Sequence, residues 1–84
     1  MNLDKHAISF EEAMTVFGDP EALDWEAGAH SLDEPRYKRL GRSVLGRVVL
    51  VVYTVRGGEH GKETIRIISA RQSSRKERQG YARS

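Results

Sequence analysis

The 84-residue chain contains only two prolines and no cysteine, and the lack of cysteine excludes two kinds of site. Without cysteine it can form neither disulfide bonds nor thiolate metal sites, a composition consistent with a reducing compartment. No apolar run approaches the ~20 residues that a membrane-spanning helix needs, and no signal-peptide core follows the first residues. We therefore expect a soluble, cytoplasmic protein that does not act at a membrane.

The motifs of several large enzyme classes are also missing. The three histidines, at positions 6, 30 and 60, form no His-x-x-x-His or Glu-x-x-His pair, so we expect no metal site and no cofactor. There is no Gly-x-Ser-x-Gly elbow, Walker lysine loop or dinucleotide fingerprint, so hydrolase, nucleotidase and dehydrogenase functions lack support. The glycines between Arg56 and Lys62 precede a strand instead of a helix, which predicts a hairpin loop and not a phosphate cradle.

Charge is distributed very unevenly along the chain. Residues 1–34 carry one basic and nine acidic side chains, whereas residues 35–84 carry thirteen basic and three acidic ones. The two segments thus have net charges of −8 and +10, although the whole chain is only +2. This asymmetry predicts a surface in the second half that binds a polyanion, and the simpler interpretation is solvation of a sheet edge and a terminal helix.

The most regular pattern runs from residue 47 to residue 71. Arg47–Val55 is rich in β-branched residues and predicts a central strand buried on both faces, and Glu63–Arg71 predicts its hairpin partner. Arg36–Val44 predicts a strand whose mixed polarity suits a sheet edge, joined to the central strand through Gly46. Glu21–Ala27 fits a further short strand.

Helix signals stand at both ends of this pattern. Ser9 to Glu12 fits a capping box, so a helix should begin at Phe10 and end before Gly18-Asp19-Pro20, with Phe10, Ala13, Met14 and Phe17 facing the sheet. Ser74 to Glu77 repeats the box and predicts a short basic helix. Residues 1–84 should therefore form one α+β domain: an N-terminal helix, an antiparallel meander of three to four strands and a short basic C-terminal helix.

A group of arginines in the last strand and helix is the strongest functional candidate. Alternation along a strand places Arg66 on one face with Thr64, Ile68 and Ala70, and Arg71 on the other. On the final helix, Arg75, Arg78 and Tyr81 recur at every third position. If this stripe lies over the sheet rim, Arg71, Arg78 and Tyr81 converge, and the planar guanidinium fork suits phosphate oxygens.

Each of these residues also has a purely structural interpretation. Arg66 fits an ion pair with an acid of the N-terminal half, such as Glu11 or Asp24. Tyr81 fits an anchor that holds the last helix on a thin core, and Glu77 fits a capping-box partner better than a general base.

The chain resembles the BrnT family, ribonuclease toxins of type II toxin–antitoxin modules with a RelE-like fold. The residues that carry the resemblance are Lys5-His6, Ser9-Phe10-Glu11-Glu12-Ala13, Phe17-Gly18-Asp19-Pro20, Glu34-Pro35-Arg36, Gly41, Arg66-Ile67-Ile68-Ser69-Ala70-Arg71 and Arg75-Lys76-Glu77-Arg78-Gln79-Gly80-Tyr81. Family members usually begin with a Phe-x-Trp-Asp strand and a helix before the Lys-His motif, where this chain starts. The resemblance thus implies a longer native N-terminus or a missing strand, which would leave an unpaired sheet edge.

The resemblance implies metal-independent cleavage of messenger RNA, in which the ribose 2′-hydroxyl attacks the neighbouring phosphate. The implied residues are Arg66, Arg71 and Arg78 for charge stabilisation, Tyr81, Glu77 and His30 for proton transfer, and Arg36, Lys38, Arg42 and Arg75 for the RNA backbone. The implied partner is a BrnA-like antitoxin with a ribbon-helix-helix domain, and operator DNA is bound only through the toxin–antitoxin complex.

Two other hypotheses stay open at this point. The basic half could serve a non-catalytic module that grips nucleic acid or an acidic protein, which predicts salt-sensitive binding without cleavage. Alternatively, the chain is a degenerate remnant that folds only with a partner.

Overall fold

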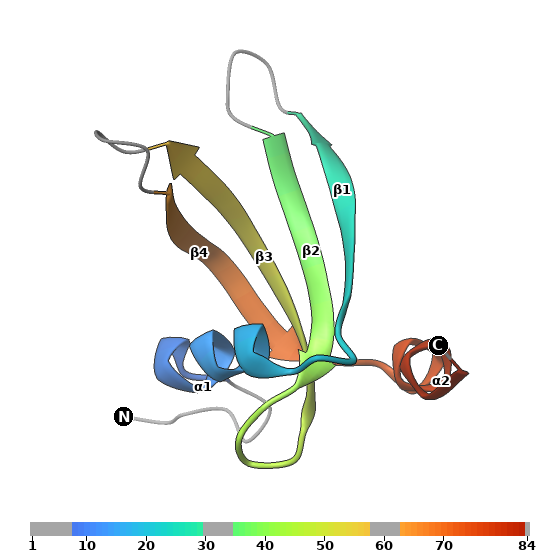
Figure 1. Ribbon diagram of the computed structural model, residues 1–84. Coiled ribbons are helices and arrows are strands. Elements are labelled where there is room, and N and C mark those ends of the chain that lie inside the picture. The colour runs from blue at the N-terminus through green and yellow to red at the C-terminus, as the bar shows by residue number, and fades with distance from the viewer. Residues whose placement is uncertain (1–7, 30–34, 58–62, 84) are drawn as a thin grey trace.

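The protein is a four-stranded antiparallel sheet with one helix at each end of the chain (Figure 1). The computed structural model describes residues 8–29, 35–57 and 63–83. The elements are α1 (Phe10–Thr15), the 3₁₀ turn η1 (Val16–Gly18), β1 (Leu23–Ala29), β2 (Pro35–Arg42), β3 (Val48–Gly57), β4 (Glu63–Gln72) and α2 (Arg75–Arg83). The predicted α+β meander is confirmed, with four strands in the order β1-β2-β3-β4. Within the described ranges, no helix is both long and apolar enough to span a membrane.

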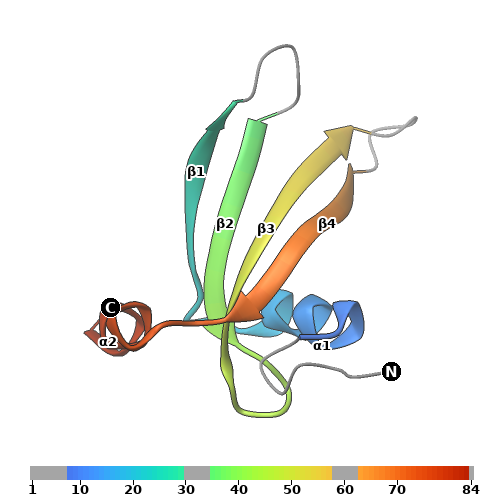
Figure 2. The same ribbon diagram turned by 180° about the vertical axis from the view of Figure 1, so that it is seen from behind.

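The central position of β3 is confirmed, but the edge position expected for β2 is wrong. β3 pairs with β2 and β4, and its residues Val48–Val51 are buried on both faces of the sheet. β2 lies between β1 and β3, so the two edges are β1 and β4 (Figure 2). Arg39 of β2 is tolerated inside the sheet because its guanidinium group donates to the carbonyl oxygens of Val16 (3.1 Å) and Asp19 (3.0 Å).

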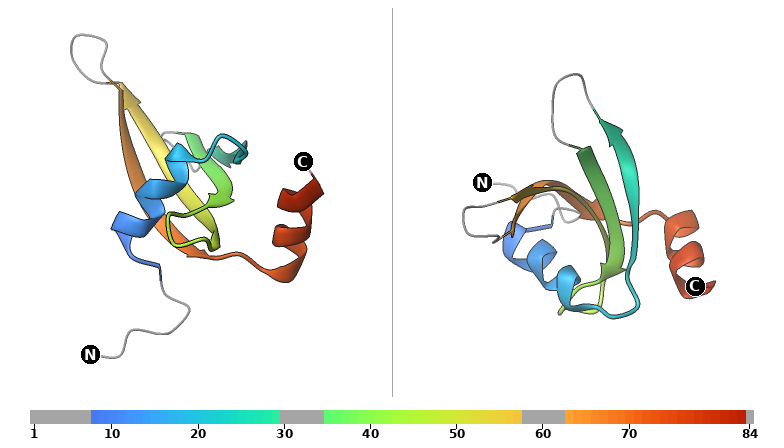
Figure 3. Two further views of the ribbon diagram at one scale, coloured as in Figure 1. Left: turned by 60° about the horizontal axis from the view of Figure 1, so that its bottom comes forward. Right: turned by 45° about the horizontal axis from the view of Figure 1, so that its top comes forward.

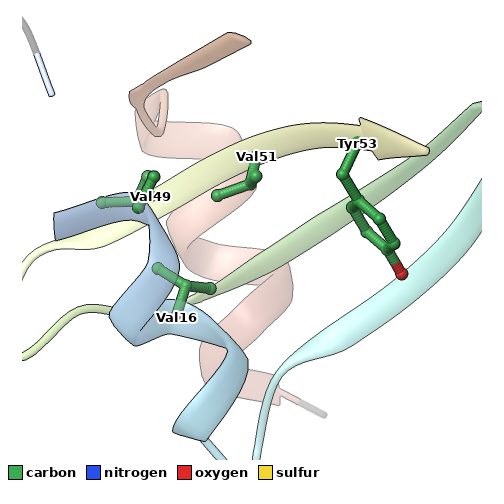
Figure 4. Close-up of a cluster of buried hydrophobic side chains, with 5 residues drawn as sticks. Val16, Val49, Val51 and Tyr53 are labelled. Atoms are coloured by element: carbon green, nitrogen blue, oxygen red, sulfur yellow. The ribbon is translucent and has the colours of Figure 1, made fainter. Parts of the chain in front are cut away.

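The main core lies between the α1–η1 segment and one face of β3. Figure 4 shows Val16 directed at Val49 and Val51, with Tyr53 farther along the same strand. Val16, Val49 and Val51 are fully buried. The Phe17 ring meets the Tyr53 ring edge-on, with 5.0 Å between centroids. This small cluster holds the helix onto the sheet.

The apolar stripe predicted for the first helix is only partly buried. Ala13 is fully buried and Phe17 packs against the core, but Phe10 is 60% exposed and Met14 is 48% exposed. The stripe assumed a continuous α-helix, whereas α1 has six residues and continues as a 3₁₀ turn at Val16. The side of this segment that faces the core is formed by Ala13, Val16 and Phe17, and Phe10 and Met14 lie outside it.

The start of α1 is confirmed, but only half of its capping box forms. The Glu12 amide donates to Ser9 Oγ at 3.0 Å. The Glu12 carboxylate does not return to Ser9. Instead, it accepts hydrogen bonds from Ser43 Oγ (2.6 Å) and from Arg47, which also forms an ion pair with it. Glu12 is only 6% exposed, so these partners tie α1 to the β2–β3 turn.

We expect Glu12→Ala to lower the free energy of unfolding by about 2 kcal/mol, because Ser43 and Arg47 lose their shared acceptor. Hydrogen bonding from Arg47 outweighs burial and lowers the pKa of Glu12 below its ordinary 4.5. A lowered carboxyl pKa adds stability above the ordinary value, and that stability is lost as the pH falls below it. Urea denaturation between pH 3 and pH 7 should show this loss in the native protein and not in the variant; parallel pH curves would contradict the prediction.

Candidate nucleic-acid interface

The sheet has one face covered by α1 and one face that α1 leaves uncovered, which we call the open face. Figure 3 shows α1 and α2 on different sides of the sheet. Residues directly opposite one another on paired strands share a face. The row Leu23–Leu40–Leu50–Arg71 follows from the three registers, and Leu40 and Leu50 belong to a second core cluster apart from the α1 cluster. Arg71 therefore lies on the open face.

A β-bulge in β4 puts Arg66 on the same face as Arg71, which corrects the strand alternation used above. Val52 pairs with Ser69, but Tyr53 pairs with Ile67, so Ile68 is an extra residue in β4. An extra residue shifts the alternation of side chains by one position. Arg66, which pairs with Thr54, therefore returns to the open face.

Six basic side chains of the described residues lie on the open face. Lys38 pairs with Val52 and Arg42 with Val48, which places both on the face of Leu50. Arg36 follows by alternation, because its neighbour Tyr37 pairs with Tyr53 on the α1 face. Arg56 lies two positions after Thr54 on β3 and pairs with Thr64, so it shares this face, and the six residues are Arg36, Lys38, Arg42, Arg56, Arg66 and Arg71. Charge of one sign on a single face is the arrangement that attracts a polyanion.

Arg71 and Arg78 both bond the backbone at the junction between β4 and α2. Arg71 donates to the Gln72 carbonyl oxygen at 3.2 Å, and Arg78 donates to the next carbonyl oxygen, that of Ser73, at 2.9 Å. The two guanidinium groups thus bind adjacent peptide units. The predicted convergence of Arg71, Arg78 and Tyr81 on one phosphate stays a prediction.

Glu77 closes this junction as both a helix cap and an ion-pair partner. Its two carboxylate oxygens accept two bonds of 2.9 Å from the Arg71 fork, and Oε1 also accepts the Ser74 amide at 2.8 Å. The Glu77 amide donates to Ser74 Oγ at 3.2 Å, which completes the predicted capping box. Arg71 lowers the pKa of Glu77, so its carboxylate is ionised at neutral pH and weakly basic.

Tyr81 anchors α2 to the sheet, as its structural interpretation expected. Its ring packs against Leu40, Val48 and Leu50, and its hydroxyl donates to Asp19 Oδ2 at 2.7 Å. The Arg42 guanidinium lies 5.8 Å from the ring centroid. The bond to Asp19, reinforced by burial, raises the pKa of Tyr81, so the phenol keeps its proton at neutral pH.

Asp19 is the functional-site residue that sequence reasoning missed. Besides Tyr81, its carboxylate accepts the backbone amides of Arg42 (2.7 Å) and Glu21 (2.9 Å). Burial raises the pKa of Asp19, but these hydrogen bonds together with the Tyr81 hydroxyl outweigh it and lower the pKa. The sequence signal was Gly18-Asp19-Pro20, which was interpreted as a helix stop and as part of the family resemblance, and not as an acceptor for Tyr81. An open, shallow pocket beside Asp19 is lined by Thr15, Gly18, Asp19, Arg42, Ser43 and Val44.

The remaining predicted residues are not part of the junction. Arg66 lies five positions before Arg71 on β4, roughly 15 Å along the strand. The expected ion pair between Arg66 and Asp24 is absent, because Asp24 accepts Arg39 and Tyr53 at 2.6 Å each on the α1 side. Arg75 is exposed at the start of α2, and His30 falls outside the described residues. Across the described ranges, no three His, Cys, Asp or Glu side chains are grouped so as to hold a metal ion.

A family model for BrnT, the ribonuclease toxin of type II toxin–antitoxin systems, matches residues 1–77. None of the curated proteins matches the chain.

Proposed function

This chain belongs to the BrnT family of ribonuclease toxins of type II toxin–antitoxin systems, and we propose that it cleaves messenger RNA without a metal ion at the β4–α2 junction. The observation that carries this proposal is the placement of charge. Six basic residues among those described share the open face of the sheet, and Arg71 and Arg78 both bond the backbone where β4 leads into α2. An RNA strand lying on this face would bring a phosphodiester to two guanidinium groups.

The proposed reaction depends chiefly on positive charge around the phosphate that is cleaved. The 2′-hydroxyl oxygen forms a bond to phosphorus, the bond to the 5′-oxygen breaks, and the products are a 2′,3′-cyclic phosphate and a 5′-hydroxyl. The intermediate phosphorane carries extra negative charge. Arg71 and Arg78 would stabilise it, because guanidinium groups stay charged and bind two oxygens at once. Arg66, Arg36, Lys38, Arg42 and Arg75 would hold neighbouring phosphates without reading sequence.

The proton-transfer roles follow from the pKa shifts. Tyr81 retains its proton, so it would donate to the leaving 5′-oxygen and not accept the 2′-hydroxyl proton. Glu77 is ionised but weakly basic and already held by Arg71, so it would mainly position that guanidinium. We therefore propose that charge stabilisation supplies most of the rate, with His30 kept as a further proton-transfer candidate.

The family name implies a protein antitoxin. We propose that it is of the ribbon-helix-helix type and that the complex, not the toxin alone, binds operator DNA. Co-expression with a candidate antitoxin should relieve growth arrest caused by this chain.

A cleavage assay tests the nuclease proposal directly. Purified protein incubated with end-labelled single-stranded RNA should yield fragments with 2′,3′-cyclic phosphate ends, at the same rate with magnesium as with excess chelator. An RNA whose 2′-hydroxyls are methylated should stay intact, because its nucleophile is blocked. Fragments from the methylated RNA, or activity only with added metal, would refute the proposed chemistry.

A non-catalytic RNA-binding module is the second candidate. The observation that favours it is that Arg71 and Tyr81 are already bonded to Glu77 and Asp19. This candidate predicts binding that weakens with salt, with a logarithmic slope of about −0.7 per phosphate contacted on a single strand, and no products on long incubation.

A further inference from the structure

Trp25, the sole tryptophan of the chain, is 42% exposed in the edge strand β1. Its register partner is Lys38, which pairs in turn with Val52, so Trp25 lies on the open face. Its neighbour Asp24 confirms the assignment from the other side, since Asp24 accepts from Tyr53 in the α1-side core. The largest aromatic side chain of the protein thus lies on the same face as the six basic residues.

The surroundings of Trp25 do not account for this exposure. In the described part of the chain, the aromatic and cation–π contacts involve Phe17, Tyr37, Tyr53 and Tyr81, and not Trp25. The side chains of β1 that flank it on the other face, Asp24 and Glu26, are polar. A large apolar ring in contact with water, beside a lysine on a basic face, is the combination by which proteins hold single-stranded nucleic acid.

We propose that Trp25 stacks against an unpaired base of single-stranded RNA, while Lys38 and Arg36 hold the adjacent phosphates. The inference rests on the proposed function, in which the open face binds RNA, and it names the substrate class and one contact. Single-stranded RNA fits better than duplex, because bases within a helix are stacked on each other and cannot lie on a tryptophan ring.

The distance between Trp25 and Arg71 indicates how a base stacked on Trp25 would affect substrate binding and the chemical step. Three strand spacings separate β1 from β4, about 14 Å across the sheet. The stacked base is therefore a few nucleotides from the phosphate at the β4–α2 junction. A contact at this distance strengthens substrate binding and sets the register of the strand, and it leaves the chemical step unchanged.

Trp25 is its own reporter, because no other tryptophan contributes fluorescence. Titration with an uncleavable 2′-O-methyl oligonucleotide should quench its emission, and an abasic oligomer of the same length and charge should bind more weakly without quenching. Anisotropy of a labelled oligonucleotide should show about tenfold weaker binding for Trp25→Ala and a smaller loss for Trp25→Phe. Phe10→Ala, which removes an exposed ring from α1, is the matched control and should bind normally.

In the cleavage assay, Trp25→Ala should raise KM and leave kcat unchanged. Equal binding of abasic and base-bearing oligomers, with salt-sensitive affinity retained, would overturn the stacking contact and leave the RNA-binding face intact. Failure of every oligomer to bind native protein would overturn the inference together with the proposed function.

Discussion

Replacing Arg71 with alanine should reduce the rate of RNA cleavage by about 100-fold, the loss that follows removal of one charge-stabilising donor from an active site. Both fork nitrogens of Arg71 bond Glu77, and Arg78 bonds the Ser73 carbonyl oxygen of the same junction, so in the proposed mechanism Glu77 holds the Arg71 charge where the phosphorane would form. Single-turnover cleavage of a labelled RNA measures the effect. Thermal unfolding should change little, because the Arg71–Glu77 pair is largely exposed and such pairs contribute ~0–1 kcal/mol.

Two variants separate charge, geometry and fold. Arg83→Ala removes the same charge from the exposed last turn of α2 and should cleave at the native rate. Arg71→Lys keeps the charge but loses the planar fork, so an intermediate rate of roughly one tenth is expected. If Arg83→Ala and Arg71→Ala lose activity equally, net charge and not the junction determines cleavage.

The elements of this fold could be predicted from the sequence because their signals are local. The β-branched run of β3 and the Ser74 capping box depend only on neighbouring residues, and both are confirmed. The central place of β2 was missed, because it depends on β1 pairing with β2, and the alternation in Glu21–Ala27 indicates a strand but not its partner. Nor could the bulge at Ile68, which lies within an ordinary apolar run and becomes visible only against the register of β3.

Contacts between distant segments limited the prediction of the site in the same way. Glu12 fits a capping box in sequence, yet its carboxylate bonds residues 31 and 35 positions away. In the sequence, Gly41 was notable only as part of the family resemblance. The structure gives a physical reason for a glycine at this position, because a Cβ there would lie 2.8 Å from Ala22 Cβ and 3.2 Å from Asp19 Oδ2. A glycine on β2 is therefore what lets the Asp19 segment approach the sheet.

Because its segment lies so close to β2, Asp19 is the residue on which the position of α2 depends. No residue of α2 is buried, and besides the Arg71–Glu77 pair its tie to the sheet is the Tyr81 side chain, held by its ring and by the bond to Asp19. Asp19→Ala should lower the free energy of unfolding by about 2–3 kcal/mol, because the Tyr81 hydroxyl and the Arg42 and Glu21 amides all lose their acceptor. Urea denaturation followed by circular dichroism measures this loss.

Tyr81→Phe separates helix docking from the rest of the Asp19 network. It removes one hydrogen bond and keeps the ring on Leu40, Val48 and Leu50, so a smaller loss of about 1 kcal/mol is expected. Glu26→Ala, an exposed acid of β1, is the charge-matched control and should match the native protein. If α2 is positioned through Asp19, hydrogen exchange of the α2 amides should quicken strongly in Asp19→Ala and modestly in Tyr81→Phe. Unchanged exchange in Asp19→Ala, with cleavage intact, would show that the helix is held by its ring and the Arg71–Glu77 pair alone.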